Sequence, residues 1–345
     1  MGGSRWSDDS YQDRAAIRNA RVGVHGQSAA FSYTHAVQTG AAPQAVNPLL
    51  DPKRAAGATS PFAGRVMRES RDSADHPESL AIAVFFDVTG SMGSIPVTLE
   101  KKLAGLMALL LRKGYVDHPQ ILFGAVGDAH TDKSPLQVGQ FESGVEMDDD
   151  LDKFYLEGNG GGQMHETYEL AHYFMWKHSS IDCWEKRQHK GYFFSMGDEA
   201  PYDVVRKAHV QTFIGDALEA DIPTAEVIRG LEERYHVFHI KIEEGSYRHN
   251  ADIEQAWVRL LGERFLKLED QNNVAELIAS TIGLTEGTTD IDRVPDDLAV
   301  MGASAAVGRS VTQALTVYAQ SSHLRAGAVS GPLPAAAPAG GVTRL

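Results

Sequence analysis

The stretch Leu80-Ala-Ile-Ala-Val-Phe-Phe-Asp87-Val-Thr89-Gly-Ser91-Met92 decides the fold. Its first seven residues are all apolar, which is typical of a strand that is buried on both faces of a parallel sheet. The run ends at Asp87, and the hydroxyl residues Thr89 and Ser91 follow at alternate positions. A carboxylate and two hydroxyl groups are hard oxygen donors of the kind that Mg2+ prefers. The stretch therefore predicts a buried strand that ends in a candidate metal site.

Short apolar runs and longer amphipathic stretches alternate on either side of this motif. Further apolar runs predict strands at 121–127, 191–196, 235–241 and 264–268. Helical spacing of apolar residues predicts helices at 97–113, 165–178, 223–234, 251–261 and 272–283. The alternating residues 136–142 indicate an antiparallel edge strand. We therefore predict an α/β fold with a doubly wound, mostly parallel, Rossmann-like sheet that has helices on both faces.

Acidic residues stand at or just beyond the carboxyl ends of three predicted strands: Asp87, Asp128 and Asp198. Doubly wound sheets bind ligands beyond the carboxyl ends of their strands, near the point where the strand order reverses. The three positions therefore indicate a binding site rather than a chance turn. Asp128 is equally compatible with an ordinary loop position.

The charge is strongly acidic, with 46 Asp and Glu against 32 Lys and Arg and a net charge of −14. Such a chain is unsuited to nonspecific nucleic-acid binding, which needs a basic surface. It suits a basic partner, a metal or a solubilising surface. The single cysteine, Cys183, makes no internal disulfide and favours a reducing compartment. Without an apolar leader or a membrane-length apolar run, we expect a cytoplasmic protein.

The sequence pattern divides the chain into four regions. Residues 1–77 show no sustained period, and we expect a loosely structured arm. Residues 78–285 carry the alternating pattern of the main domain. Residues 286–324 form an extension in which the Ala- and Val-rich stretch 304–319 predicts a helix. Residues 325–345, rich in Gly, Pro and Ala, are expected to be disordered.

The pentapeptide Asp87-Val-Thr89-Gly-Ser91 resembles the metal-ion-dependent adhesion site (MIDAS) of von Willebrand factor A (vWA) domains, which reads Asp-x-Ser-x-Ser. The resemblance continues in the glycine-rich loop Gly158-Asn-Gly-Gly-Gly-Gln-Met-His-Glu-Thr167. It ends with the strand end Phe193-Phe-Ser-Met-Gly-Asp198-Glu199. The three loops follow the order of the family over about residues 78–285. The resemblance implies a vWA-like fold of the intracellular prokaryotic type.

The resemblance also implies a set of metal ligands. Ser91 and Thr89 would coordinate through their hydroxyl groups, Asp87 directly or through water, and Asp198 through water. Two departures from the family pattern concern the other loops. Gln163 stands where the second loop has a threonine, so either Gln163 or the later Thr167 would take that place, and the third-loop acid is shifted by one residue. The full candidate set is Asp87, Thr89, Ser91, Asp198, Gln163, Thr167 and Asp128.

The function implied by the resemblance is a non-enzymatic protein-interaction module. Mg2+, or Mn2+ or Ca2+ in its place, would leave one coordination position for an Asp or Glu of a protein partner. Prokaryotic proteins of this type often work with a MoxR-type AAA+ ATPase, which is therefore a candidate partner.

Two other functions remain open. Asp87-Val-Thr-Gly-Ser also resembles the nucleophile loop of haloacid dehalogenase-like phosphatases and phosphotransferases, in which Asp87 would be phosphorylated and Lys190 would neutralise charge. Alternatively, the chain is a structural assembly component with a vestigial metal site. Two local features have simpler interpretations. Glu166 is expected to lie at the start of a helix, and His165, Glu169 and His172 are expected to share its surface face rather than a zinc site.

Overall fold

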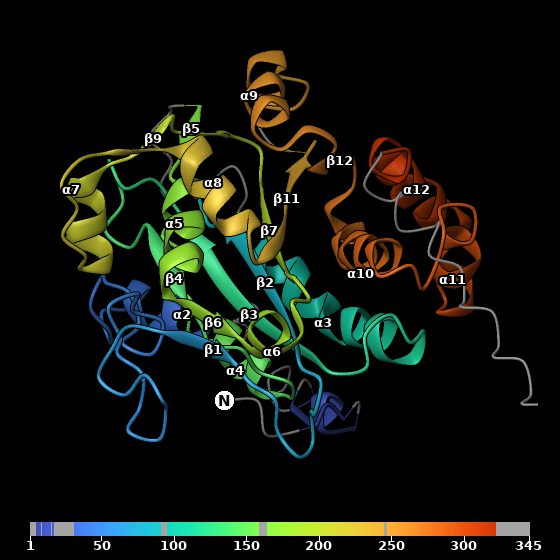
Figure 1. Ribbon diagram of the computed structural model, residues 1–345, viewed down its shortest axis with the longest axis horizontal. Coiled ribbons are helices and arrows are strands. Elements are labelled where there is room, and N and C mark those ends of the chain that lie inside the picture. Colours follow the sequence, from blue (N-terminus) through green and yellow to red (C-terminus); the bar gives the residue numbers. More distant parts are fainter. Residues whose placement is uncertain are drawn as a thin grey trace, which may run out of the picture.

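The computed structural model describes residues 5–7, 9–14, 16, 31–90, 95–158, 164–244 and 247–321. Its centre is a six-stranded sheet with the strand order β12-β11-β7-β2-β3-β4 (Figure 1). The strands are β2 (Leu80–Asp87), β3 (Pro119–Val126), β4 (Leu136–Val138), β7 (Gly191–Gly197), β11 (Tyr235–Ile242) and β12 (Phe265–Leu268).

The sheet is parallel except at one edge. β2 pairs in parallel with β3 and β7, and β11 pairs in parallel with β7 and β12. β4 pairs antiparallel with β3. The chain leaves β2 toward β3 on one side and returns to β7 on the other, so the strand order reverses between β2 and β7. The predicted doubly wound sheet with one antiparallel edge strand is confirmed.

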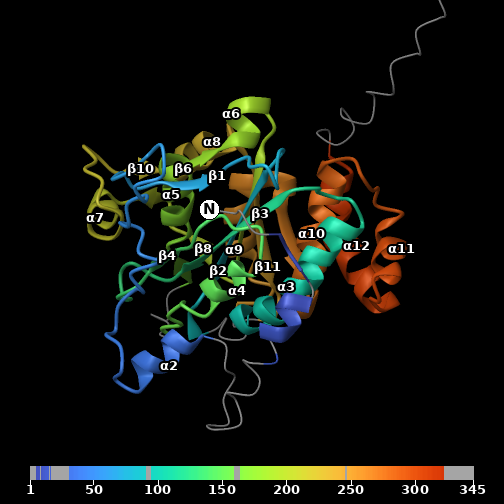
Figure 2. The same ribbon diagram turned by 90° about the horizontal axis from the view of Figure 1, so that it is seen from below.

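Helices cover both faces of this sheet. On one face, α3 (Ile95–Arg112) packs against α10 (Val274–Thr285), and on the other α5 (Tyr168–His178) packs against α8 (Thr224–Glu232) (Figures 1 and 2). A further helix, α9 (Ala251–Leu261), follows β11. These elements lie within a few residues of the predicted ranges because each apolar period ends where the chain turns. The exception is the start of α5, which begins three residues after the predicted helix and leaves His165 and Glu166 in a separate strand.

The core forms around β2, whose eight residues are all buried. Phe85 stacks on Phe193 of β7 with ring centroids 5.3 Å apart. On the other side of β2, the Phe85 ring occupies the space that a Cβ at Gly124 of β3 would need. Gly124 is thus required by the close packing of β2 against β3, and β2 is held rigidly with its last residue, Asp87, at the carboxyl edge of the sheet.

The region before β2 contains ordered elements. Helix α2 spans Ser32–Gln38, and β1 (Arg68–Ser70) pairs in parallel with β6 (Ser179–Ile181). The Arg68 side chain is fully buried and donates to the backbone carbonyls of Asp51 and Arg54. Such a buried guanidinium is stabilised only if its hydrogen bonds are made. These contacts fasten residues 51–70 to the main domain.

The region after α10 forms two helices, α11 (Val294–Val300) and α12 (Ala305–Ala319). α12 packs against α10 and β12. Asp297 of α11 is held by an ion pair with Lys113, at 2.6 Å, and by the Tyr115 hydroxyl group, at 2.8 Å. Residues 325–345, which were predicted to be disordered, lie outside the described residues. Among the helices of the described residues, none combines the length and apolarity of a membrane span.

Candidate metal site

Asp87 is the buried centre of the candidate site. Its Oδ1 accepts hydrogen bonds from the backbone N–H of Thr89, at 2.7 Å, and from the Thr89 hydroxyl group, at 2.6 Å. Both side chains are at most 2% exposed. The turn after β2 thus brings the first carboxylate and the first hydroxyl group of the motif together. Ser91 lies outside the described residues.

Tyr168 makes a second contact with Asp87. The Tyr168 hydroxyl group, at the start of α5, donates to Asp87 Oδ2 over 3.0 Å. A Cβ added at Gly197, the last residue of β7, would clash with this hydroxyl group. Gly197 is therefore the small residue that allows a helix on one face of the sheet to orient a carboxylate at the end of β2.

Glu166 and Glu199 join Asp87 through a short strand pairing that the sequence did not reveal. β5 (His165–Glu166) runs parallel to β8 (Ala200–Pro201), with His165 opposite Ala200 and Glu166 opposite Pro201. This pairing brings residues 165–166 beside the residues that follow β7. Candidate ligand atoms of Asp87, Glu166 and Glu199 lie within 4.8 Å of one another. The three carboxyl groups therefore form one cluster.

The expected role of Glu166 at a helix terminus is wrong, because this residue belongs to β5 and is 2% exposed. The expected surface face of His165, Glu169 and His172 is also wrong. His165 precedes α5, while Glu169 and His172 are buried within it. Apolar spacing alone extended the predicted helix backwards over three residues, of which His165 and Glu166 pair as a strand.

Burial and mutual repulsion dominate the electrostatics of the cluster. Burial raises the pKa of Asp87 above its ordinary range, and the charge of Asp198 adds to the effect. The pKa of Glu166 is raised by burial and by the charges of Asp87 and Glu199, and the pKa of Glu199 is raised mainly by burial. Burial and mutual repulsion therefore oppose simultaneous ionisation of the three carboxyl groups, and a bound cation would relieve that repulsion.

The two other candidate aspartates lie beside the cluster. Asp198 follows β7 directly, is fully buried, and accepts a hydrogen bond from the backbone N–H of Tyr247 over 3.2 Å. Asp128 follows β3, is 2% exposed, and accepts hydrogen bonds from the His130 N–H, at 3.0 Å, and the Tyr202 hydroxyl group, at 3.3 Å. The charges of both aspartates act on Glu199. The carboxyl ends of β2, β3 and β7 thus all contribute an acid to the same edge.

The second loop differs from the sequence expectation in its detail. Thr167 is fully buried, and its hydroxyl group donates to the carbonyl of Gly127 and accepts from the N–H of Ala129 over 3.2 Å. Both hydrogen bonds tie Thr167 to the turn after β3. Gln163, the other candidate of this loop, lies outside the described residues. Glu166 is the residue of the loop that the structure brings to Asp87.

The donor set fits a hard divalent cation. Glu166 Oε2 and Glu199 Oε2 are buried and have no hydrogen-bond partner among the described residues. Buried carboxylate oxygens of this kind are stabilised by a proton or a cation. Oxygen-only donors favour Mg2+, Mn2+ or Ca2+ over softer metals.

The arrangement removes one element of the phosphatase interpretation. Lys190 precedes β7 and lies at the amino end of the sheet, whereas Asp87 lies at the carboxyl end of the parallel neighbour β2. Its Nζ donates to the carbonyl oxygen of Glu232 over 2.7 Å. Lys190 therefore cannot neutralise charge at Asp87.

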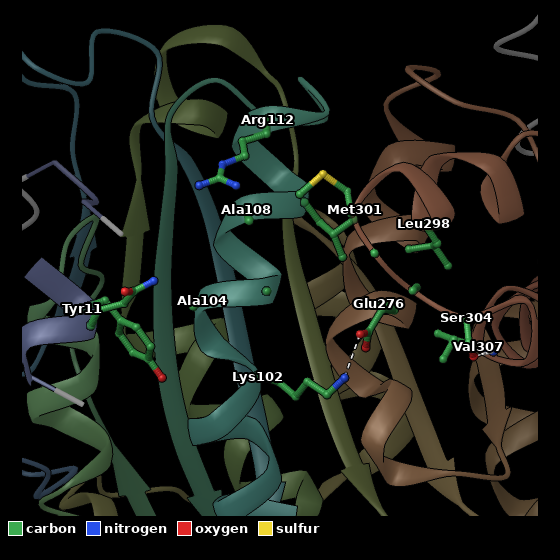
Figure 3. Close-up of a pocket in the computed structure, with 15 residues that line it drawn as sticks. Tyr11, Lys102, Ala104, Ala108, Arg112, Glu276, Leu298, Met301, Ser304 and Val307 are labelled. Atoms are coloured by element: carbon green, nitrogen blue, oxygen red, sulfur yellow. Dashed lines mark hydrogen bonds and ion pairs between the residues drawn. The ribbon is translucent and has the colours of Figure 1, made fainter. Parts of the chain in front are cut away.

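A cavity of about 520 Å3 lies along α3, away from these carboxylates (Figure 3). Small residues of α3, Ala104 and Ala108, form one wall, and Met301 and Val307 face them from the α11–α12 region. Lys102 in its wall is paired with Glu276 of α10 over 2.8 Å. The cavity shares no residue with the carboxylate cluster, so we treat it as a groove between packed helices.

Comparison with known proteins gave matches among solved structures. No protein-family model matches the sequence, and no curated protein sequence matches it. The chain is similar to the pilus adhesin SpaC of Lactobacillus rhamnosus GG, with 8% identity over 63% of this chain and 31% of that one, and a TM-score of 0.43. It is also similar to proximal thread matrix protein 1 of the mussel byssus with a zinc-occupied MIDAS motif, with 12% identity, 63% and 48% coverage and a TM-score of 0.37.

A third similar structure is a von Willebrand factor type A protein from Catenulispora acidiphila, with 12% identity over 61% of this chain and 43% of that one, and a TM-score of 0.34. This chain thus spans less than half the length of all three proteins. The strand order and the register of the sheet establish the fold independently of these scores.

Proposed function

We propose that the chain is a metal-dependent protein-interaction module and not an enzyme. A divalent cation, Mg2+ or in its place Mn2+ or Ca2+, binds at Asp87 and takes an Asp or Glu of a partner protein as a further ligand. The observation that supports this proposal most directly is the buried cluster of Asp87, Glu166 and Glu199 at the point where the strand order reverses. This is the place where doubly wound sheets bind their ligands.

The residues of the chain have distinct tasks in this proposal. Asp87, Thr89 and Ser91 hold the cation from the turn after β2, and Asp198 holds it from the end of β7. Tyr168 orients Asp87 through its hydrogen bond. The cation supplies the positive charge that attracts an acidic side chain. Thr167, Gln163 and Asp128 remain candidates for the second loop and its rim, and Glu166 joins them because its carboxyl group lies within 4.8 Å of an Asp87 oxygen.

The partner and the compartment are also proposals. A MoxR-type AAA+ ATPase is the partner that the vWA resemblance suggests, and a cytoplasmic location follows from the same type of protein. The strongly acidic composition agrees with a module that does not bind nucleic acid.

Affinity capture tests the proposed function. Immobilised full-length chain is incubated with a MoxR-type ATPase, purified from the organism that encodes the chain, in MgCl2 and in EDTA. We expect retention in MgCl2, release by EDTA and loss of retention in Asp87→Asn. The exposed Glu226 of α8 provides a matched control, because Glu226→Gln removes one carboxylate that is not part of the Asp87, Glu166 and Glu199 cluster. Equal retention in EDTA and in Asp87→Asn would refute bridging through the metal.

A further inference from the structure

A fully buried lysine lies near the carboxyl end of β11, outside the residues assigned to the metal site. Lys241 is 0% exposed, and its Nζ forms an ion pair with Glu243 Oε1 over 2.9 Å. The carboxylate of Glu254, on α9, lies 3.9 Å from the same Nζ. A lysine is rarely buried completely unless it is paired, and removal of one partner of a buried pair leaves the other charge uncompensated. The pair therefore fixes the chain where β11 ends.

Glu243 connects this fixed point to the segment that follows β11. Its Oε2 accepts a hydrogen bond from the backbone N–H of His249 over 2.8 Å and lies 3.1 Å from His249 Nδ1. His249 has a φ of 57°, in the left-handed region that non-glycine residues seldom adopt. The next residue, Asn250, caps α9 by accepting from the N–H groups of Asp252 and Ile253. Glu243 thus holds the start of α9 against the end of β11.

The same segment holds the residues that follow β7. The backbone N–H of Tyr247 donates to Asp198 Oδ2 over 3.2 Å. Trp257 of α9 is fully buried, and its Nε1 donates to the carbonyl oxygen of Glu199 over 2.9 Å. α9 also packs against β8, which begins one residue after Glu199. The segment that Glu243 fixes therefore supports the third loop of the candidate metal site from outside the site.

We propose that Lys241 and Glu243 are positioning residues of the metal site, which keep the Asp198 carboxylate and the Glu199 backbone in place for the cation. This inference rests on the proposed function and extends it to residues outside the three loops. Neither side chain touches the cation, because Lys241 is paired with Glu243, and Glu243 acts through the backbone of residues 247–249. Groups that hold metal ligands in this indirect way typically change the metal affinity by about 10–100-fold when they are removed.

The affinity of full-length variants for Mn2+ tests this inference. The protein is stripped with EDTA and titrated with Mn2+, and free Mn2+ is followed by its electron paramagnetic resonance signal. We expect Glu243→Ala to raise the dissociation constant by about 10–100-fold. Glu243→Gln keeps an oxygen that can accept from the His249 N–H, so it should lose less affinity than Glu243→Ala. Circular dichroism before each titration verifies that the variant is folded.

Asp297→Ala provides a matched control for lost stability. Asp297 is also a buried carboxylate that is paired with a lysine, Lys113, at 2.6 Å. Lys113 lies between the end of α3 and the start of β3, at the opposite edge of the sheet from the metal site. We expect Asp297→Ala to lower the free energy of unfolding and to leave the Mn2+ dissociation constant unchanged.

A double-mutant cycle separates positioning from a general loss of stability. If Glu243 acts through Asp198, Glu243→Ala should weaken Mn2+ binding less in the Asp198→Ala background than in the wild type. Additive effects of the two substitutions on the affinity would overturn the positioning role. Should Glu243→Ala not fold, Lys241→Met replaces it in every comparison, because this variant removes the charge that holds Glu243 and keeps a side chain of similar size.

The outcomes distinguish this inference from the proposed function. If the wild type binds Mn2+ and the folded Glu243→Ala variant binds it equally well, the positioning role is wrong and the metal-dependent module stands. An equal loss of affinity in Glu243→Ala and Asp297→Ala likewise overturns the positioning role. A wild-type chain that binds no Mn2+ overturns both the inference and the proposed function.

Discussion

Replacing Glu166 by glutamine should stabilise the metal-free protein and weaken its response to Mg2+. Glu166 is 2% exposed and has carboxyl groups of Asp87 and Glu199 within 4.8 Å. Two unit charges at that distance repel each other by about 3 kcal/mol at an effective dielectric constant of about 20. We therefore expect Glu166→Gln to raise the free energy of unfolding in EDTA by about 1–3 kcal/mol.

The same substitution should reduce the stabilisation that Mg2+ provides. A ligand at a hundred times its dissociation constant stabilises the native state by about 2.7 kcal/mol. Loss of one carboxylate ligand that weakens binding ten- to a hundredfold would leave about 0.4–1.4 kcal/mol at the same Mg2+ concentration. Mg2+ should thus raise the free energy of unfolding only slightly in the variant but strongly in the wild type.

Thermal unfolding in EDTA and in excess MgCl2 measures both effects. In a chain of this size, one kcal/mol corresponds to roughly 2–4 °C in the melting temperature. We expect the variant to melt above the wild type in EDTA and to gain less from MgCl2, and Glu226→Gln to match the wild type in both. A variant that melts below the wild type in EDTA and gains as much from MgCl2 would refute the repulsive cluster.

Three further predictions concern the support of the site. Tyr168→Phe removes the donor to Asp87 Oδ2 and should lower the free energy of unfolding by about 1–3 kcal/mol, measured as a lower urea midpoint; an unchanged midpoint would show that the hydrogen bond is energetically neutral. Gly197→Ala should cost about 1–3 kcal/mol by overpacking against the Tyr168 hydroxyl group, and a double-mutant cycle should show a smaller cost in the Tyr168→Phe background. Burial lowers the pKa of His172 to about 4, so the native state binds fewer protons than the unfolded state below the ordinary pKa of about 6.5. Stability should fall by about 3 kcal/mol as pH decreases from about 6.5 to 4, and this slope should be smaller in His172→Gln; equal slopes would assign the acid sensitivity to other groups.

The strands and helices of the fold could be predicted from the sequence because each depends mainly on the pattern of neighbouring residues. β2 has the predicted bounds, 80–87, since an apolar run that is buried on both faces ends where the first carboxylate appears. The helices α3, α8 and α9 agree with their predicted ranges within two residues because the helical period stops at a turn. The antiparallel edge strand β4 was visible from alternation alone. The pattern of short parallel strands and helices then left few possible sheet topologies.

The site could be predicted only in part because its remaining contacts depend on a strand pairing between segments that are distant in the sequence. Asp87 ends one strand of the main sheet and Asp198 follows another, so their shared edge was predictable. Glu166 falls within an apparent helical period, and only its pairing in β5 with β8 turns it toward Asp87. One hint was present in the sequence. Glu199 stands directly after Asp198, at the end of a fully buried strand, where a second acid has no surface role.

Glu166 gives the second loop a carboxyl group near Asp87, whereas the vWA resemblance expects a threonine in that loop. The Thr167 hydroxyl group is engaged by Gly127 and Ala129 and thereby fixes the loop to the turn after β3. The adjacent Glu166 carboxyl group is then the group of this loop that meets Asp87. An acidic group thus stands where the resemblance expects a neutral hydroxyl group, next to carboxyl groups that already repel it. Replacing Glu166 by glutamine therefore tests the cluster more directly than any change at Thr167, whose hydroxyl group is engaged by backbone atoms.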